Sequence, residues 1–444
     1  MSGVGNPEGI GSQGRVPAPI AGGSAEVRIG GLGRLPVRRF VAVLVGIVLL
    51  ASFGCGAPVA EFRTNELYLI HQEFKSEPLP ASKRRELQQN LKDLMVALFG
   101  TPDEPYFPEV EGVDIRRVCD PVKLQMAAGP VRLERSGAPR GLYREHCAHC
   151  HGITGDGRGP TAEFLNPYPR DYRRGLYKFK STPAAEPPTH EDLQRILING
   201  IPGTAMPSFR LLPEQDREAL IHYVRYLSIR GQVERTLLEA TFQTGDLDLT
   251  EISLEQLKAP ENIEFVKSVV ADIVTRWAQA DYQATPVPPP PENFESAESI
   301  RRGRELFYGP IANCVKCHGE TALGDGQTTD YDEWTKELMP NEPDKVARFL
   351  ATGAALPPRN IRPRNLRLNV FRGGRRPVDL YWRIRNGILA SGMPAASMKP
   401  DDAPPDDPRL TSDDIWHLVA YVRSLPYDDL SAPQHLPVYQ RERQ

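Results

Sequence analysis

The fold of this chain is decided by two short stretches, CAHCH at residues 147–151 and CVKCH at residues 314–318. Both have the pattern C-x-x-C-H, and a glycine follows each of them. Together they contain four of the six cysteines. The two that remain, Cys55 and Cys119, are too few to build a disulfide scaffold in a chain of 444 residues.

The C-x-x-C-H spacing is the one that attaches haem c. A short turn brings both thiols within reach of the two haem vinyl groups, and the next residue projects its imidazole onto the iron as an axial ligand. A zinc site or a redox dithiol also uses C-x-x-C, but zinc needs four ligands, and a dithiol does not require the adjacent histidine twice. We therefore predict two covalently attached haem c groups, held by Cys147, Cys150 and His151 and by Cys314, Cys317 and His318.

A sixth ligand for each iron is predicted from a second repeat. Among seven methionines, Met206 lies in NGIPGTAMP at residues 199–207, and Met393 lies in NGILASGMP at residues 386–394. The two stretches align without a gap, so the chain supplies its own second copy. An isolated methionine is usually core packing, but two in matched loops downstream of C-x-x-C-H indicate axial ligands. Met398 is a competitor in the second copy, although the first copy offers no match to it.

Further elements repeat between the two copies. Each has a Gly-Asp-Gly after the haem motif, at residues 155–157 and 324–326. Each also has a Pro-Arg element that ends in Asp or Asn and a closing helix with apolar residues at helical spacing. The Pro-Arg elements are residues 169–171 and 363–365, and the predicted closing helices are residues 216–229 and 413–425, the second capped by Ser412.

The order of helix, C-x-x-C-H, methionine loop and closing helix resembles class I cytochrome c. The resemblance covers residues 130–231 and 295–428, roughly half of the chain. It implies an all-α fold in which the first and last helices cross and the haem lies between His and Met. Aromatic residues of both helices would then pack at each crossing, namely Tyr143 with Tyr223 and Phe307 with Tyr421.

In this family, a proline carbonyl beyond the haem motif commonly accepts a hydrogen bond from the proximal imidazole and orients it. Pro160 suits that role for His151, whereas the second copy has no proline at the matching place. The side chains of Arg170 and Arg364 could pair with haem propionates, but solvated loop arginines are an equal alternative.

An apolar run at residues 40–60 sets the compartment. It carries no charge, three arginines lie just before it, and the first charge after it is Glu61. Such a run can span a bilayer, and the positive flank places the rest outside the cytoplasm, on the periplasmic side. A cleaved signal peptide has the same flank and core. Lipid attachment to Cys55 is a third alternative, for which Ser52 is a poor match because an aliphatic residue is expected there.

These observations predict an all-α protein with two cytochrome c-type domains in series. The predicted parts are a disordered extension at 1–39, a membrane anchor or signal segment at 40–60, a helical region of unknown role at 61–129, the first cytochrome c domain at 130–231, a helical and Pro-rich linker at 232–294, the second cytochrome c domain at 295–428 and a tail at 429–444.

Charge and ligation together indicate the function. The formal net charge of −3 argues against nucleic acid as a partner. If both irons are six-coordinate, neither haem offers a vacant site to substrate, so we predict no catalytic residue. The predicted function is one-electron transfer between a donor and an acceptor protein by an exported, membrane-attached dihaem cytochrome. The alternatives are a dihaem peroxidase-like or dehydrogenase-like enzyme, or a cytochrome subunit of a larger respiratory complex.

Overall fold

The computed structural model describes most of the chain that follows the apolar run. Described are residues 60–427, apart from residues 77, 253–254, 332–346, 348 and 354. The predicted extension 1–39, the membrane segment up to residue 59 and the tail 429–444 lie outside the described residues. Within the described part, no helix has the length and hydropathy that crossing a membrane requires. All described residues belong to one compact unit of the chain.

The first domain is built around one long helix, α9 (Glu214–Glu239). Side chains on every face of this helix are buried, as expected for a helix surrounded by others. The predicted helix ended at Ile229, but α9 continues for ten more residues to Glu239, because Val233 and Leu237 are again fully buried.

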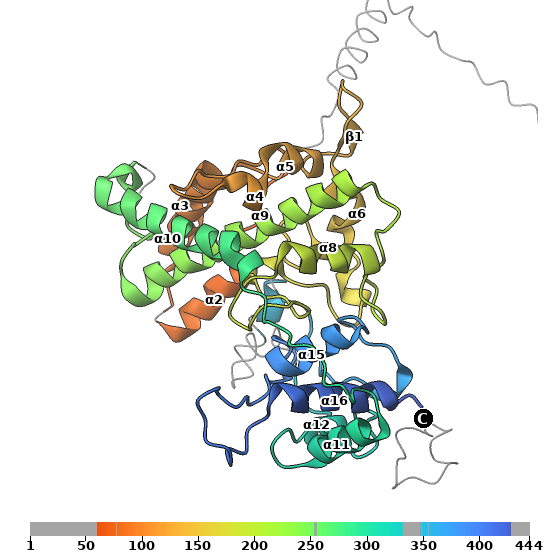
Figure 1. Cartoon of the computed structure of the whole chain (residues 1–444). Coiled ribbons are helices and arrows are strands. Elements are labelled where there is room, and N and C mark those ends of the chain that lie inside the picture. Colours follow the sequence, from red (N-terminus) through yellow and green to blue (C-terminus); the bar gives the residue numbers. More distant parts are fainter. Residues whose placement is uncertain are drawn as a thin grey trace, which may run out of the picture. The chain divides into compact units, whose positions relative to one another are not determined.

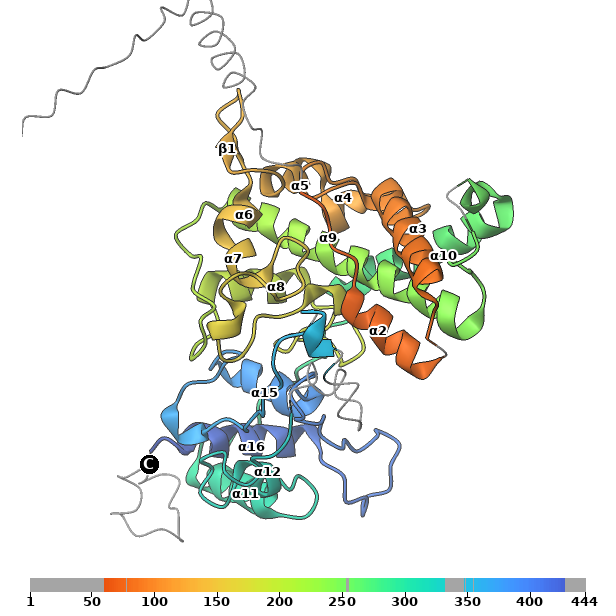
Figure 2. The same ribbon diagram turned by 180° about the vertical axis from the view of Figure 1, so that it is seen from behind.

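The helices that contact α9 come from three parts of the sequence. They are α2 (Glu66–Lys75), α3 (Ala81–Phe99), α4 (Ile115–Cys119), α5 (Pro121–Ala127), α6 (Leu142–His146), α8 (His190–Asn199) and α10 (Pro260–Gln279). The two views in Figures 1 and 2 place α3 and α10 on opposite sides of α9. The N-terminal region and the helix of the predicted linker therefore both pack on the first domain and share its core.

Short elements complete this part of the chain. They are α7 (Ala148–His151), η1 (Ala162–Phe164), η2 (Tyr172–Arg174), the π-turn η3 (Ala240–Thr244), η4 (Gln256–Lys258) and η5 (Ala280–Tyr282). An antiparallel hairpin pairs β1 (Arg132–Leu133) with β2 (Pro139–Arg140). The all-α prediction thus describes the fold well, but it did not include this hairpin.

The second domain is smaller and consists of α11 (Ala297–Tyr308), α12 (Val315–His318), η6 (Leu366–Leu368), α15 (Pro377–Asn386) and α16 (Ser412–Ser424). Its first and last helices, α11 and α16, make the most extensive helix contact of the described chain. Phe307 and Tyr421 meet at this contact with ring centroids 5.3 Å apart, and Tyr143 and Tyr223 meet at 4.9 Å in the first domain. Both aromatic pairs were predicted from the resemblance.

Helix α16 begins one residue earlier than the sequence indicated. Thr411, and not the predicted Ser412, is the N-cap. The Thr411 hydroxyl accepts a hydrogen bond from the Asp414 N–H, and the Asp414 carboxylate accepts one from the Thr411 N–H. This reciprocal pair satisfies two backbone donors at once, which a cap at Ser412 would not do. Thr189 and Asp192 start α8 in the same way.

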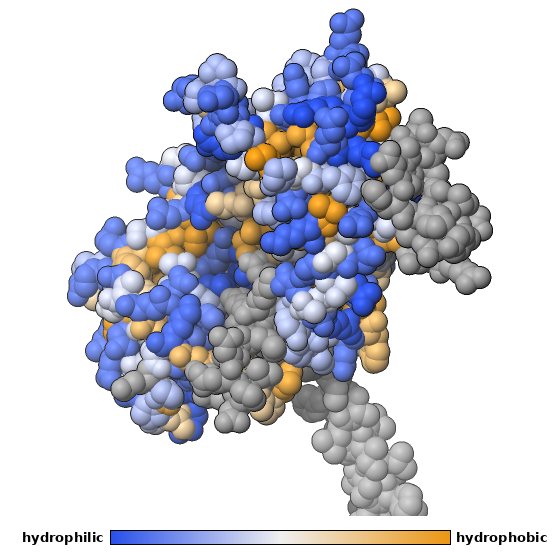
Figure 3. Space-filling model, turned by 90° about the horizontal axis from the view of Figure 1, so that it is seen from below, coloured by the Kyte–Doolittle hydropathy of each residue, from blue (hydrophilic) through white to orange (hydrophobic). Residues whose placement is uncertain are grey.

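The face seen in Figure 3 shows, outside the grey atoms, hydrophobic residues interspersed with hydrophilic ones. Among the exposed apolar side chains are Leu211 and Phe164 of the first domain. Scattered exposure of this kind is ordinary for a protein surface.

Gly303 allows the close contact between α11 and α16. A Cβ at this position would overlap the carbonyl oxygen of His417 and stand 2.8 Å from the Tyr421 Cβ. We expect Gly303→Ala to lower the free energy of unfolding of the second domain by about 1–3 kcal/mol, because backbone cannot yield as a flexible side chain does. The exposed neighbour Arg301→Ala is the control. Equal denaturation midpoints for both variants would contradict this packing.

Candidate haem sites

Each C-x-x-C-H motif forms a single helical turn. The Cys147 carbonyl accepts hydrogen bonds from the backbone of Cys150 and His151, at 3.1 and 2.9 Å. The Cys314 carbonyl does the same in the second motif, at 3.2 and 2.9 Å. Residues three apart lie on one face of such a turn, so the two thiols of each motif project to the same side. This is the arrangement that attachment to one macrocycle requires.

The imidazole of each motif is held by a backbone carbonyl. His151 Nδ1 lies 3.1 Å from the Arg170 carbonyl oxygen, and His318 Nδ1 lies 3.1 Å from that of Arg364. Because a carbonyl can only accept, Nδ1 carries the proton in both rings. The Nε2 lone pair is then free to bind a metal, as in most histidine ligands.

The predicted role of Pro160 is wrong, since the Arg170 carbonyl takes its place. The physical reason is that the Pro-Arg element folds back over the haem motif. The Tyr172 N–H donates to the Gly155 carbonyl at 2.8 Å. In the second copy, the Leu366 N–H donates to the Ala322 carbonyl at 2.9 Å. Both copies therefore orient the imidazole through a Pro-Arg carbonyl, and neither uses a proline carbonyl for this purpose.

This folding-back depends on one glycine in each copy. A Cβ at Gly157 would stand 2.6 Å from the Pro169 carbonyl oxygen, and one at Gly324 would overlap that of Pro363. The N–H groups of these two glycines also donate to the carbonyls of His151 and His318, each at 2.9 Å. Gly157 thus corresponds to Gly324, so the predicted match of the two Gly-Asp-Gly stretches was out of register by two residues.

Burial shapes the chemistry of these groups. His151 is only 8% exposed and stacks on Tyr172, and burial lowers its pKa to about 4. Burial likewise lowers the pKa of His318. Both imidazoles are therefore neutral near pH 7, as a metal ligand must be. Burial raises the pKa of the Cys147 and Cys314 thiols to about 12. A redox dithiol needs a lowered thiol pKa, so the structure argues against that alternative.

The two methionine loops have the same construction. The Ile201 N–H donates to the Met206 carbonyl at 3.1 Å, and the Ile388 N–H donates to the Met393 carbonyl at 3.0 Å. The Thr204 hydroxyl donates to the Ile201 carbonyl and accepts from the Met206 N–H, at 2.8 and 3.1 Å. Ser391 makes the equivalent pair of bonds in the second loop. Sequence comparison found the loops, and the structure shows what closes them.

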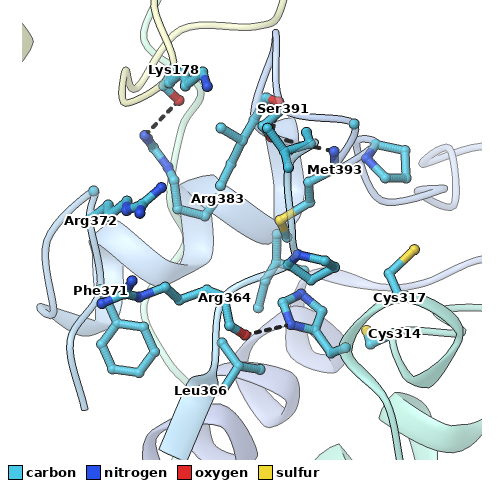
Figure 4. A pocket seen from close by; sticks show the side chains of 18 of the residues that line it. Lys178, Cys314, Cys317, Arg364, Leu366, Phe371, Arg372, Arg383, Ser391 and Met393 are labelled. Atoms are coloured by element: carbon cyan, nitrogen blue, oxygen red, sulfur yellow. Dashed lines mark hydrogen bonds between the residues drawn. The ribbon is translucent and has the colours of Figure 1, made fainter. Parts of the chain in front are cut away.

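The predicted residues of the second site surround one cavity. Cys314, Cys317, His318 and Met393 all line it, and its volume is about 710 Å³. Cofactor pockets commonly measure about 300–1,000 Å³. The rest of the lining includes apolar side chains such as Phe307 and Leu366. Figure 4 shows the Met393 thioether pointing into this pocket. Two thiols, an oriented imidazole and a thioether around a mainly apolar cavity fit haem c.

In the first site, Cys147 belongs to the hydrophobic core, and Met206 packs against that core. His151, Cys150 and the Pro-Arg carbonyl adopt the same local structure as in the second copy. Cys119, which the sequence left unexplained, is also in this core, with its sulfur 3.7 Å from the His222 carbonyl oxygen. Its role is therefore packing.

Positive side chains that the sequence did not single out line the second pocket. Arg372, Arg383 and Lys178 join the predicted Arg364 there, as Figure 4 shows. Burial lowers the pKa of Arg372, and it lowers that of Arg383 to about 10. Such cations suit the two propionates of a haem. No motif marks them, because they come together only through the fold.

One further cluster has the spacing of a metal site. The ligand atoms of His190, Glu218 and His222 lie within 4.8 Å of one another. However, the Lys123 ammonium stands 3.3 Å from both Glu218 and His222 Nε2. The Asp120 N–H donates to His222 Nδ1 at 3.0 Å, so the proton of the neutral ring sits on Nε2. A metal could bind Nε2 only if this proton were removed. The Lys123 ammonium already supplies a positive charge beside the Glu218 carboxylate.

Two families of cytochrome c type match the chain. Residues 135–224 match the model described as cytochrome C oxidase, cbb3-type, subunit III, and residues 300–426 match the model of cytochrome c. Cytochrome c55X of Paracoccus denitrificans (strain Pd 1222) is 35% identical over 101 residues, 22% of this chain and 79% of that protein. A solved chain of the Kuenenia stuttgartiensis reducing HAO-like protein complex aligns at a TM-score of 0.42 and 23% identity, over 67% of this chain and 98% of its own length.

His222 makes acid stability testable. Burial lowers its pKa to about 4, so between pH 6.5 and 4 the unfolded chain binds a proton there and the folded protein does not. Unfolding therefore becomes easier as the pH falls through this window, by up to about 3 kcal/mol. We expect His222→Asn, which keeps an acceptor for Asp120, to flatten the denaturation profile over this range. An unchanged pH slope would contradict the assignment.

Proposed function

The chain belongs to the cytochrome c family, and we propose that it is an exported dihaem cytochrome that carries single electrons between two redox proteins. The observation that carries this proposal is the construction of the two sites, each with a C-x-x-C-H turn, a carbonyl-oriented imidazole and a closed methionine loop. The chain is a c-type cytochrome involved in electron transfer, with two cytochrome c-type domains in tandem. The number of haems, their His/Met ligation and the class I assignment are our proposals.

The proposed ligands are His151 and Met206 for the first iron and His318 and Met393 for the second. Bound haem would supply reversible one-electron chemistry at its iron. The cysteines would hold the macrocycle, and the Pro-Arg carbonyls fix the proton of each imidazole on Nδ1, which leaves Nε2 free for the iron. The methionine thioether does not titrate and favours the reduced iron, which raises the potential relative to a second histidine. With a histidine and a methionine both supplied by the chain, a bound haem would keep no open position for substrate, which favours electron transfer over catalysis.

Spectra of the purified holoprotein test this proposal directly. We expect two low-spin, six-coordinate haems that bind added ligands slowly before reduction. A high-spin, five-coordinate haem in the oxidised protein would support the alternative of a dihaem redox enzyme, which needs an open or easily opened position.

Single methionine variants assign the ligands. We expect Met206→Ala to lower the potential of one haem and Met393→Ala to lower that of the other, by a sizeable part of the roughly 0.8 V range that axial ligands span. Met398→Leu is the matched control and should leave both potentials unchanged in a redox titration. If Met398→Leu lowers a potential and Met393→Ala does not, the second ligand is Met398.

The apolar run at residues 40–60 supports export and membrane attachment. We expect the full chain in the membrane fraction, released by detergent and not by high salt, and cleaved by protease added outside the cytoplasmic membrane. A chain with residues 1–60 replaced by a cleavable signal peptide should be released without detergent. The Cys55→Ala variant separates a lipid anchor, which it would abolish, from a retained helix. Full-length protein that needs no detergent for release would contradict membrane attachment.

A further inference from the structure

The two haem domains are joined by hydrogen bonds from buried side chains to backbone carbonyls. Arg383 of α15 is 6% exposed and donates to the Lys178 carbonyl at 3.3 Å and to that of Lys180. The Asn386 side chain, on the same helix, donates to the Ser181 carbonyl at 2.9 Å. If the two domains separated, the buried Arg383 guanidinium would lose these carbonyl acceptors, and a buried donor without a partner is costly. The contact is therefore specific and costly to break.

A second contact lies next to the first haem motif. The Arg359 guanidinium donates to the carbonyls of Glu163, at 2.7 Å, and Leu165. It also lies over the Tyr168 ring, 3.9 Å from the centroid. The Tyr168 hydroxyl donates to the Pro357 carbonyl at 3.0 Å. The segment between the first haem motif and its Pro-Arg element is thus fastened to the second domain.

These contacts make the first domain a wall of the second haem pocket. Residues 166–171, together with Lys178 and Phe179, line the same cavity as His318 and Met393. Arg170 is among them, and its carbonyl oxygen is the group that holds His151. The element that orients the first imidazole therefore also borders the cavity for the second haem.

The converse contact comes from the second Pro-Arg element. The Arg364 carbonyl holds His318, while the Arg364 guanidinium lies beside Gly203 in the loop of the first proposed methionine ligand. A methyl carbon placed on Gly203 in that loop would stand 2.7 Å from Arg364 Nη2 and 3.3 Å from the Val370 side chain. Each Pro-Arg element thus touches the sites of both domains.

We propose that electrons pass directly between the two haems inside one molecule, across the wall formed by these two Pro-Arg elements. This inference rests on the proposed dihaem function. In the step, a single electron leaves the ferrous iron of one site, which becomes ferric, and reduces the ferric iron of the other, with no transfer of atoms or protons. Electron tunnelling slows steeply with distance, so a shared wall favours this route over a collision between two molecules.

The test uses the full-length holoprotein in detergent. A redox titration first establishes two haems and their ligation, which tests the proposed function by itself. A short reductive pulse that delivers less than one electron per molecule then populates both haems, and the redistribution is followed by absorbance. If the two potentials are too close, Met206→Ala separates them. We expect a first-order rate constant that stays the same over a tenfold dilution. A rate that falls in proportion to concentration would overturn internal transfer while leaving the dihaem function intact.

Variants at the interface give an independent readout. We expect Arg359→Met together with Asn386→Ala, two interface residues outside the pocket lining, to slow the first-order redistribution at least tenfold, while both potentials remain unchanged. The control is Arg409→Ala, which removes only an exposed ion pair with Asp407. An interface variant that folds, keeps both potentials and redistributes electrons at the original rate would contradict the proposed route. Should the double variant fail to fold, Asn386→Ala alone tests the same interface, and the dilution experiment decides the question without any substitution.

Discussion

The hydrogen bond between each proximal imidazole and a backbone carbonyl is the constraint on which both sites depend. It places the proton on Nδ1 of His151 and His318 and leaves Nε2 for the iron. To bring the carbonyl there, the Pro-Arg element must fold back onto the haem motif. That approach leaves no room for a side chain at Gly157 or Gly324. The bond thus accounts for the repeated glycine, the repeated Pro-Arg element and the burial of the imidazole together.

What could be predicted from the sequence is what depends on local spacing. Two thiols and an imidazole must occupy one turn, so their spacing is visible in the residues themselves. The methionine loops were found because the chain carries two copies, and Gly200 and Gly387 have no room for a Cβ beside the loop carbonyls. The closing helix α16 was predicted from its apolar residues at helical spacing for the same reason, since helical periodicity is local.

What could not be predicted depends on residues that are far apart in the sequence. The acceptor for His318 lies 46 residues away, whereas the acceptor for His151 lies 19 residues away. Pro160 was the wrong choice because it is near in sequence, whereas the true acceptor is near in space. The packing of α3 and α10 on α9 was likewise not visible, because an apolar stripe indicates that a helix is buried and does not indicate against what.

The two domains are stabilised by different means, and this difference explains the interface between them. The first domain gains a large core, because helices before and after it enclose α9. The second domain has a smaller core and no comparable cover among the described residues. Its helix α15 instead uses Arg383 and Asn386 to bind the backbone of the first domain. The same contact that supports the smaller domain places the loop of the first haem against the pocket of the second, so stability and electron transfer draw on one interface.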